Sequence, residues 1–208
     1  MILNWSCAMK SNGLSRKHPP RFLLLRTKYF YNVDSMIIQY KSYVLCHLEG
    51  SAGAIFHASM TLFAKLDNLQ LRFLSHLQIS EECVFLSHNL LPLAVRRNIS
   101  MLGLLHKIQL GQAHKDWELL FPFATHGHFF STRHAMRRHT RQFCETSGKT
   151  NAYNRSLFAM VRIYNILPQD YVDATSVSDF QSLLTSEVRK RCDGGLVGWK
   201  NMFTYRSQ

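Results

Sequence analysis

The sequence predicts an all-α protein, an irregular bundle of about six helices. Apolar residues recur at spacings of three and four in several segments, which is the periodicity of a helix with one buried face. Caps, prolines and glycines stand where these segments begin and end. The length of 208 residues, 46% of them hydrophobic, suits one ordinary core. We therefore expect a basic, poorly structured leader over residues 1–33, a helical domain over residues 34–192 and a tail over residues 193–208.

The first two helices are expected in residues 34–48 and 55–77. Asp34 and Ser35 can cap the first, which should end before Gly50. Its expected apolar face consists of Ile37, Tyr40, Val44 and Leu48. The second segment shows the clearest periodicity, at spacings of four, three and four. Its expected buried stripe consists of Leu62, Leu66, Leu69 and Phe73.

Two further helices follow after Ser80 and Pro92. Ser80 is an expected N-cap with Glu81 and Glu82 in the first turn, where acids favour the positive end of the helix dipole. This short helix should end near His88. Pro92 can open the next helix at no cost in hydrogen bonding, and that helix should stop at Gly111. Its expected buried seam consists of Val95, Ile99, Leu102 and Leu105.

The last two helices are expected around residues 155–167 and from Ser176 onward. Pro168 ends the first, whose expected apolar face consists of Leu157, Phe158, Val161 and Tyr164. Ser176 and Asp179 have the spacing of a capping box. The expected apolar residues of the second are Phe180, Leu183 and Leu184, and three cations favour its C-terminal end, namely Arg189, Lys190 and Arg191.

The charge balance favours a polyanionic partner. Twenty-five Lys and Arg stand against 13 Asp and Glu, a formal net charge of +12 with a pI near 9.8. The five cysteines are an odd number and lie far apart, which indicates free thiols in a reducing compartment. The longest apolar stretch near the start is far too short for a membrane span, and the first ten residues lack a signal-peptide core. We expect an intracellular protein of nucleus or cytoplasm, neither secreted nor in a membrane.

Two segments without any acid carry the candidate phosphate-binding cations. The leader interleaves its cations with aromatic residues, a pattern that could track a strand or belong to a disordered leader. Its candidate residues are Arg16, Lys17, Arg21, Arg26 and Lys28. A long, exposed connection is expected over residues 121–141, and its candidate residues are Arg133, Arg137, Arg138 and Arg141. Guanidinium groups pair with phosphate, although a solvated surface loop explains this second segment equally well.

Other polar residues have more than one interpretation. Arg96 and Arg97 lie at a helix start, where cations are disfavoured unless an acid or a phosphate compensates. A salt bridge to Glu81 or Glu82 is the preferred explanation over a bound partner. Four histidines are the one candidate metal site, namely His126, His128, His134 and His139. Since no Cys, Asp or Glu accompanies them in that segment, solvated histidines are favoured, and we expect neither a metal nor another cofactor.

The residues that catalysis would need are not found in a suitable pattern. No serine lies in a G-x-S-x-G sequence. The seven aspartates stand alone, and the only close pair, Asp170 and Asp173, follows a proline in a turn where capping explains it. We therefore expect the chain not to be an enzyme.

Three blocks of sequence occur in an order that resembles a known family. They are "LDNLQLRFLSHL" (66–77), "NLLPLAVRRNISMLGLLHKIQLG" (89–111) and "RSLFAMVRIYNILPQDYVDATSVSDFQSLL" (155–184). Their order and spacing are similar to the C-terminal, thumb-adjacent region that follows the polymerase domain in LINE-type non-LTR retrotransposon reverse transcriptases. The resemblance covers about residues 34–190.

The resemblance implies a fragment without polymerase activity. The family's catalytic aspartates lie upstream in a Y/F-x-D-D sequence, and this chain has no adjacent Asp pair. Its scattered cysteines do not form the zinc knuckle of some relatives. The implied partners are RNA, DNA or a hybrid duplex, bound by the backbone without sequence specificity, and the missing polymerase domain is a further candidate partner. The alternative is a structural or protein-interaction remnant with no independent activity.

Overall fold

The computed structural model describes residues 30–50, 53, 56–124, 139–146, 148 and 150–204, and every structural statement below concerns these residues. They form an all-α fold, as predicted. The described residues contain no β-strand, only an isolated antiparallel bridge between Phe123 and Phe143.

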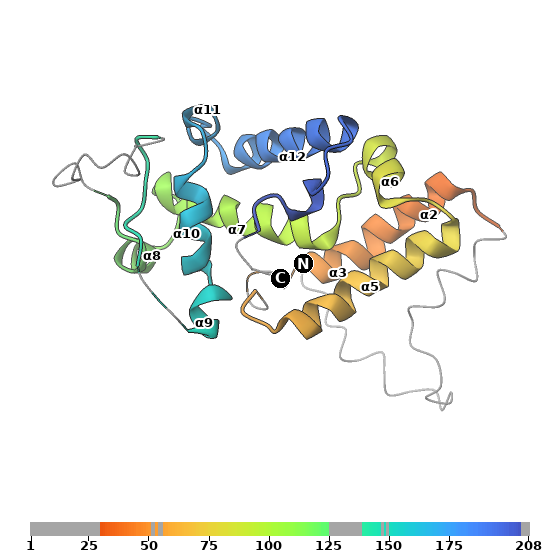
Figure 1. The fold of residues 1–208 in the computed structure, drawn as a ribbon, viewed down its shortest axis with the longest axis horizontal. Helices are drawn as coiled ribbons and strands as arrows, with labels where there is room; N and C mark the ends of the chain where they lie inside the picture. The colour runs from red at the N-terminus through yellow and green to blue at the C-terminus, as the bar shows by residue number, and fades with distance from the viewer. Residues whose placement is uncertain are drawn as a thin grey trace.

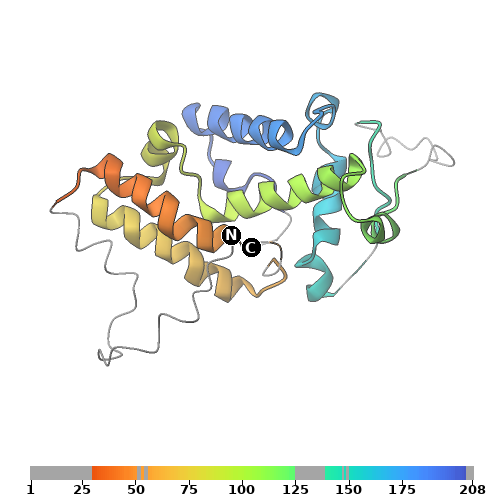
Figure 2. The same cartoon turned by 180° about the vertical axis from the view of Figure 1, so that it is seen from behind.

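The helices surround one long central helix, α7 (Leu93–Gln109). Figures 1 and 2 show α12 (Val177–Asp193) running beside α7 and α10 (Leu157–Asn165) crossing near the end of α7. On the other side, α2 (Val33–Gln39) and α5 (Met60–Leu77) lie side by side and antiparallel near the start of α7. The seam of α7 is fully buried as predicted, with Val95, Leu102 and Leu105 at 0% exposure and Ile99 at 6%.

The first helix continues from α2 through a π-helical stretch, η3 (Tyr40–Leu45), into α3 (Cys46–Glu49). Its N-cap is Asn32, whose side chain accepts a hydrogen bond from the backbone N–H of Ser35 at 2.9 Å, so the predicted caps Asp34 and Ser35 were wrong by two positions or more. The wider turns of the π-helix rotate the later residues. Leu45 is therefore buried, while Val44 and Leu48 are only partly so.

The helix α5 begins at Met60, five residues later than predicted, because Ser59 caps it by accepting from the N–H of Leu62. The predicted stripe was partly wrong: Leu62 is 52% exposed and Leu66 and Leu69 are only half-buried. The buried residues are Phe63, Gln70, Phe73 and Leu74. Phe73 stacks on Tyr40 of η3, with 4.4 Å between ring centroids, and this contact turns the buried side of α5 toward the first helix.

Two later helices begin at the predicted caps. In α6 (Glu81–His88), the side chain of Ser80 accepts from the N–H of Cys83 at 3.1 Å. In α12, Ser176 accepts from the N–H of Asp179 at 3.0 Å and donates to its carboxylate at 2.7 Å. The predicted burial on α12 holds for Phe180 and Leu184 but not for Leu183, which is 39% exposed.

Four short elements were not predicted. They are α8 (Lys115–Leu120), α9 (Asn151–Asn154), α11 (Gln169–Val172) and the 3-10 helix η4 (Trp199–Asn201). Within the segment expected as a tail, Trp199 is 5% exposed and stacks on Phe85 of α6, with ring centroids 5.6 Å apart. The core therefore includes part of residues 193–208.

The buried apolar side chains form two clusters. The larger lies among α7, α10 and α12 and contains Tyr164 and Phe180, both at 0% exposure. The smaller lies between the first helix, α5 and the start of α7. Neighbouring residues of α6 join different clusters, Val84 the smaller and Phe85 the larger. The short helix α6 thus links the two halves of the fold.

Candidate nucleic-acid interface

The positive charge is distributed very unevenly along the chain. The described residues hold 14 of the 25 Lys and Arg and all 13 Asp and Glu, so their charges almost balance. The remaining 11 cations lie in segments that contain no acid, chiefly residues 1–29 and 125–138. The surplus charge of the protein therefore belongs to segments that flank or interrupt the helical fold.

Most of the predicted interface residues fall in those segments. Eight of them lie outside the described residues, namely Arg16, Lys17, Arg21, Arg26, Lys28, Arg133, Arg137 and Arg138. The ninth, Arg141, is half-buried, and its guanidinium donates to the carbonyl of Val172 at 3.0 Å. Among the described residues, Arg141 therefore links the segment that follows residue 138 to α11.

The two ends of the connection expected over residues 121–141 are packed, which corrects the prediction of an exposed segment. Phe121 and His139 are only 3% exposed. Beyond them, the N–H of Ala124 donates to the carbonyl of Gln142 at 2.9 Å, and the N–H of Cys144 donates to that of Pro122 at 2.8 Å. The chain thus enters and leaves residues 125–138 at adjacent points.

The returning end is fixed to α10 and α11 by side-chain amides. Asn165 accepts from the N–H of Phe143 at 3.0 Å and donates to its carbonyl at 2.9 Å. Gln169 accepts from the N–H of Thr140 at 2.9 Å. The bonds of Asn165 satisfy buried backbone groups of Phe143 that would otherwise be unpaired, and with the Gln169 bond they fix residues 140–143 to α10 and α11.

His139 is a core residue in this structure. Its Nε2–H donates to the carbonyl of Tyr164 at 3.0 Å, and its Nδ1 accepts from the N–H of Arg141 at 3.2 Å. Burial lowers the pKa of His139, so the neutral ring is favoured. Of the four histidines considered as metal ligands, His126, His128 and His134 lie outside the described residues. The described residues contain no group of three possible metal ligands.

A second buried histidine, His106 of α7, was not singled out from the sequence. Its Nε2–H donates to the carbonyl of Ala174 and its Nδ1 accepts from the hydroxyl of Tyr164, both at 3.0 Å. The ring stacks on Phe180 with 4.2 Å between centroids. Burial lowers the pKa of His106. Its spacing of four from Leu102 and of seven from Ile99, both in the predicted seam, was the available signal for burial, and the role is structural.

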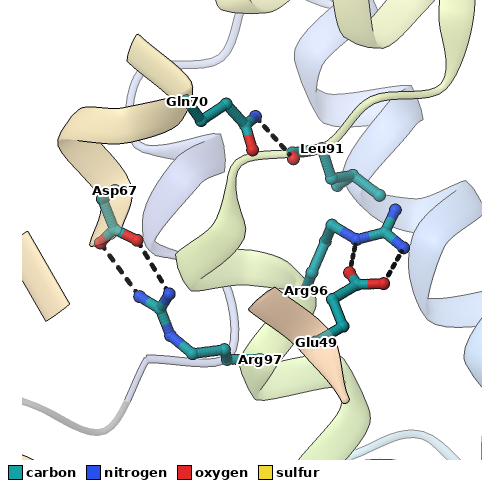
Figure 3. A network of polar contacts seen from close by, with 6 residues as sticks. All are labelled: Glu49, Asp67, Gln70, Leu91, Arg96 and Arg97. Atoms are coloured by element: carbon teal, nitrogen blue, oxygen red, sulfur yellow. Dashed lines mark hydrogen bonds and ion pairs between the residues drawn. The ribbon is translucent and has the colours of Figure 1, made fainter. Parts of the chain in front are cut away.

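Arg96 and Arg97 pair with acids of this chain (Figure 3). Arg96 binds the carboxylate of Glu49 through both Nε and Nη2, and Arg97 binds that of Asp67 at 2.8 and 3.0 Å. The predicted partners were wrong. The acids of the preceding helix are not used, and Glu81 pairs with Lys200 instead.

The Arg97 pair is buried on its arginine side. The side chain of Arg97 is 9% exposed, and its guanidinium carbon lies 4.3 Å from the ring centroid of Phe63. Nearby, the amide of Gln70 donates to the carbonyl of Leu91 at 3.0 Å (Figure 3). These contacts join α5 to the first turn of α7, so both arginines have partners that compensate their charge within the chain.

An open groove of about 620 Å³ lies between α11 and α12. Its lining includes Asp170, Asp173 and Asp179 together with serine and threonine side chains. Three carboxylates without a neighbouring cation in the lining repel phosphate, so this side of the fold is unsuited to nucleic acid.

Comparison with protein-family models, curated proteins and solved structures finds no match. In the described residues, no helix combines the length and the apolar character that crossing a bilayer requires.

Proposed function

We propose that this protein binds the phosphodiester backbone of RNA, DNA or a hybrid duplex without reading the sequence, and that it has no catalytic activity. The observation that supports this is the charge partition. The helical fold is nearly balanced, whereas 11 cations lie in segments with no acid. Arginine and lysine in such segments release counterions when they neutralise phosphates, and this supplies affinity without sequence specificity.

In this proposal the helices provide a rigid support. The hydrogen bonds of Asn165 and Gln169 hold Phe143 and Thr140, which follow residues 125–138 in sequence, and α2 follows the leader in sequence. Two separate basic segments on one support can contact the same polyanion, which raises the affinity above that of either segment alone. A protein of this kind meets RNA and DNA in the nucleus or the cytoplasm.

The test is a fluorescence-anisotropy titration of the full chain with a labelled mixed-sequence duplex and with the corresponding single strand. Two variants remove the candidate cations by substitution with glutamine. The first replaces Arg133, Arg137 and Arg138, and the second replaces the five leader cations. A control variant removes three exposed cations of the folded helices, Lys107, Lys115 and Lys190→Gln. We expect each basic-segment variant to bind more weakly than the control.

Equal weakening by the control and by the variant of Arg133, Arg137 and Arg138, each of which removes three cations, would contradict the proposal, because net charge alone would then govern binding. Absence of binding by the wild-type chain at low salt would also contradict it. Thermal unfolding of each variant provides the check on folding, and because all the substituted side chains are exposed or outside the described fold, we expect wild-type melting temperatures.

A protein-interaction role is the second candidate. It is supported by large apolar side chains that are exposed to solvent, such as Ile38 at 64%, Tyr43 at 69% and Leu119 at 83% exposure. In this alternative the chain is a remnant whose apolar surface belongs against another domain. Concentration-dependent association, measured by sedimentation, supports it, whereas cooperative unfolding as a monomer contradicts it.

The origin of the chain from a retrotransposon reverse transcriptase is likewise a proposal, supported by the order of the three sequence blocks. An in-frame or frameshifted polymerase coding sequence immediately upstream in the genome would establish it. Unrelated DNA at that position would count against it.

A further inference from the structure

We propose that the outward face of α5 forms a second contact for the nucleic-acid backbone, built from Lys65, Asn68, Arg72 and His76. This inference rests on the proposed function and assigns part of the interface to the folded helices. All four side chains are exposed. We call them the α5 stripe.

The spacing of the α5 stripe places its four side chains on one face of the helix. The intervals of three, four and four residues keep the side chains within a strip about 80° wide on the helix surface. The strip lies opposite the buried side formed by Phe63, Gln70 and Phe73. The stripe therefore points straight away from the core, along a length of about 16 Å at 1.5 Å per residue.

The stripe carries positive charge without compensation. The one acid in α5, Asp67, is bound to Arg97 on the other side of the helix (Figure 3). The charged ends of Lys65 and Arg72 have no acidic partner among the described residues. The ring of His76 is held by a 2.8 Å hydrogen bond between its Nδ1 and the carbonyl of Arg72. A row of donors with no nearby carboxylate complements a phosphate chain.

Most other cations of the described fold have partners in the chain. Lys41 donates to the carbonyl of His88, and Arg189 donates to that of Leu86. Arg191 pairs with Glu187, and Lys200 with Glu81. Lys115 is followed by Asp116 and lies near Glu118 in the same helix. The α5 stripe thus differs from these cations in lying on a long helix face free of acids.

One end of the α5 stripe lies near the start of α2. Figures 1 and 2 show the end of α5 beside the start of α2, and Phe73 in the last part of α5 stacks on Tyr40 at the start of η3. Arg72 and His76 belong to the last two turns of α5. The stripe therefore reaches the end of α5 that lies beside the first residues of α2.

The size of the stripe fits a nucleic-acid strand. Phosphates of a duplex follow one another every 3.4 Å of helix axis per strand, so a contact 16 Å long spans about four to five of them. Lys65 and Arg72 are seven residues apart, or about 10 Å, and reach different phosphates. The contact involves no base edge, which agrees with binding that does not read sequence.

The test compares Lys65→Gln/Arg72→Gln with the control Lys107→Gln/Lys115→Gln, which removes the same charge from other helices. Anisotropy titrations of the full-length variants with labelled duplex and single strand at several salt concentrations give the slope of log Kobs against log salt. Losing two phosphate contacts reduces the slope by about 1.8 for duplex and about 1.4 for single strand. We expect this reduction for the stripe variant and less than half of it for the control.

The outcomes separate the two proposals. If the wild type binds with a steep salt slope and the two variants do not differ, the α5 stripe is a solvated face and only the further inference fails. If the wild type does not bind, both proposals fail. Melting temperatures equal to that of the wild type are required of both variants, and the single substitutions, each expected to reduce the slope by about half as much, provide a second measurement.

Discussion

The Arg97–Asp67 pair allows a quantitative test of the interpretation that the arginines of α7 are structural. Replacing Asp67 by Asn keeps the shape of the side chain and removes its charge. The guanidinium of Arg97, with 9% of the side chain exposed, then loses its compensating carboxylate while it remains against the Phe63 ring. A buried charge without its partner is costly.

The size of the effect follows from the burial of the pair. Removing one partner of a fully buried ion pair costs about 3–5 kcal/mol. Because the Asp67 side chain is 31% exposed, water offsets part of this cost, and we expect the free energy of unfolding to fall by about 2–3 kcal/mol. For a chain of this length the melting temperature should fall by about 5–10 °C. The side chains of the Arg96–Glu49 pair are 27% and 30% exposed, so Glu49→Gln should cost about 1 kcal/mol or less.

Urea unfolding followed by circular dichroism measures both losses. The double variant Asp67→Asn/Arg97→Met serves as a control, because it removes the uncompensated guanidinium and should regain much of the stability lost in Asp67→Asn. A loss below about 0.5 kcal/mol for Asp67→Asn, or a double variant less stable than either single one, would refute the reasoning. A change in the salt slope of nucleic-acid binding in a folded Arg97→Met variant would show that Arg97 contacts the ligand.

Three further predictions concern stability and chemistry. Burial lowers the pKa of His106 and of His139 below the unfolded value of about 6.5. Because the unfolded chain then binds more protons than the folded chain, the free energy of unfolding should fall as pH falls from about 6.5. Urea titrations across this pH range check the prediction, and a flat profile contradicts it. Ser176→Ala should cost about 1 kcal/mol by removing the N-cap of α12, measured against Ser178→Ala, an exposed neighbour that should cost less. Cys192 is 6% exposed, and burial raises the pKa of its thiol. It should therefore react with a thiol reagent only after unfolding, in contrast to the exposed thiols of α3 and α6. Modification of Cys192 in the native protein, found by mass spectrometry, would contradict the structure.

Six helices could be predicted, among them the eight-residue α6, because their signals are local. The Ser80 and Ser176 caps each need a donor only three residues away, and the α7 seam repeats over about three turns. The short helices α8, α9 and α11 have four to six residues, too few to show a period. Local sequence therefore predicts where a long helix lies but not the brief turns between helices.

Contacts between distant residues could not be predicted. Glu49 and Arg96 are 47 positions apart, and Asp67 and Arg97 are 30 apart, so no local spacing indicates either pair. The rotation of α5 was also missed, because the buried Gln70 is polar and its bond to Leu91 becomes visible only when the helices pack. In contrast, the concentration of cations in acid-free segments could be predicted, because it is a property of the sequence and does not depend on how the helices pack.

The most direct test of the account is the salt dependence of binding between the full-length protein and a mixed-sequence duplex. If five to nine cations of the basic segments neutralise phosphates, log Kobs should fall against log salt with a slope of about −4.5 to −8. The slope should be the same for duplexes of unrelated sequence. A slope shallower than about −1, or binding confined to one sequence, would contradict this account. In the account, the helical fold is nearly charge-balanced, and the surplus cations of the basic segments bind the nucleic-acid backbone.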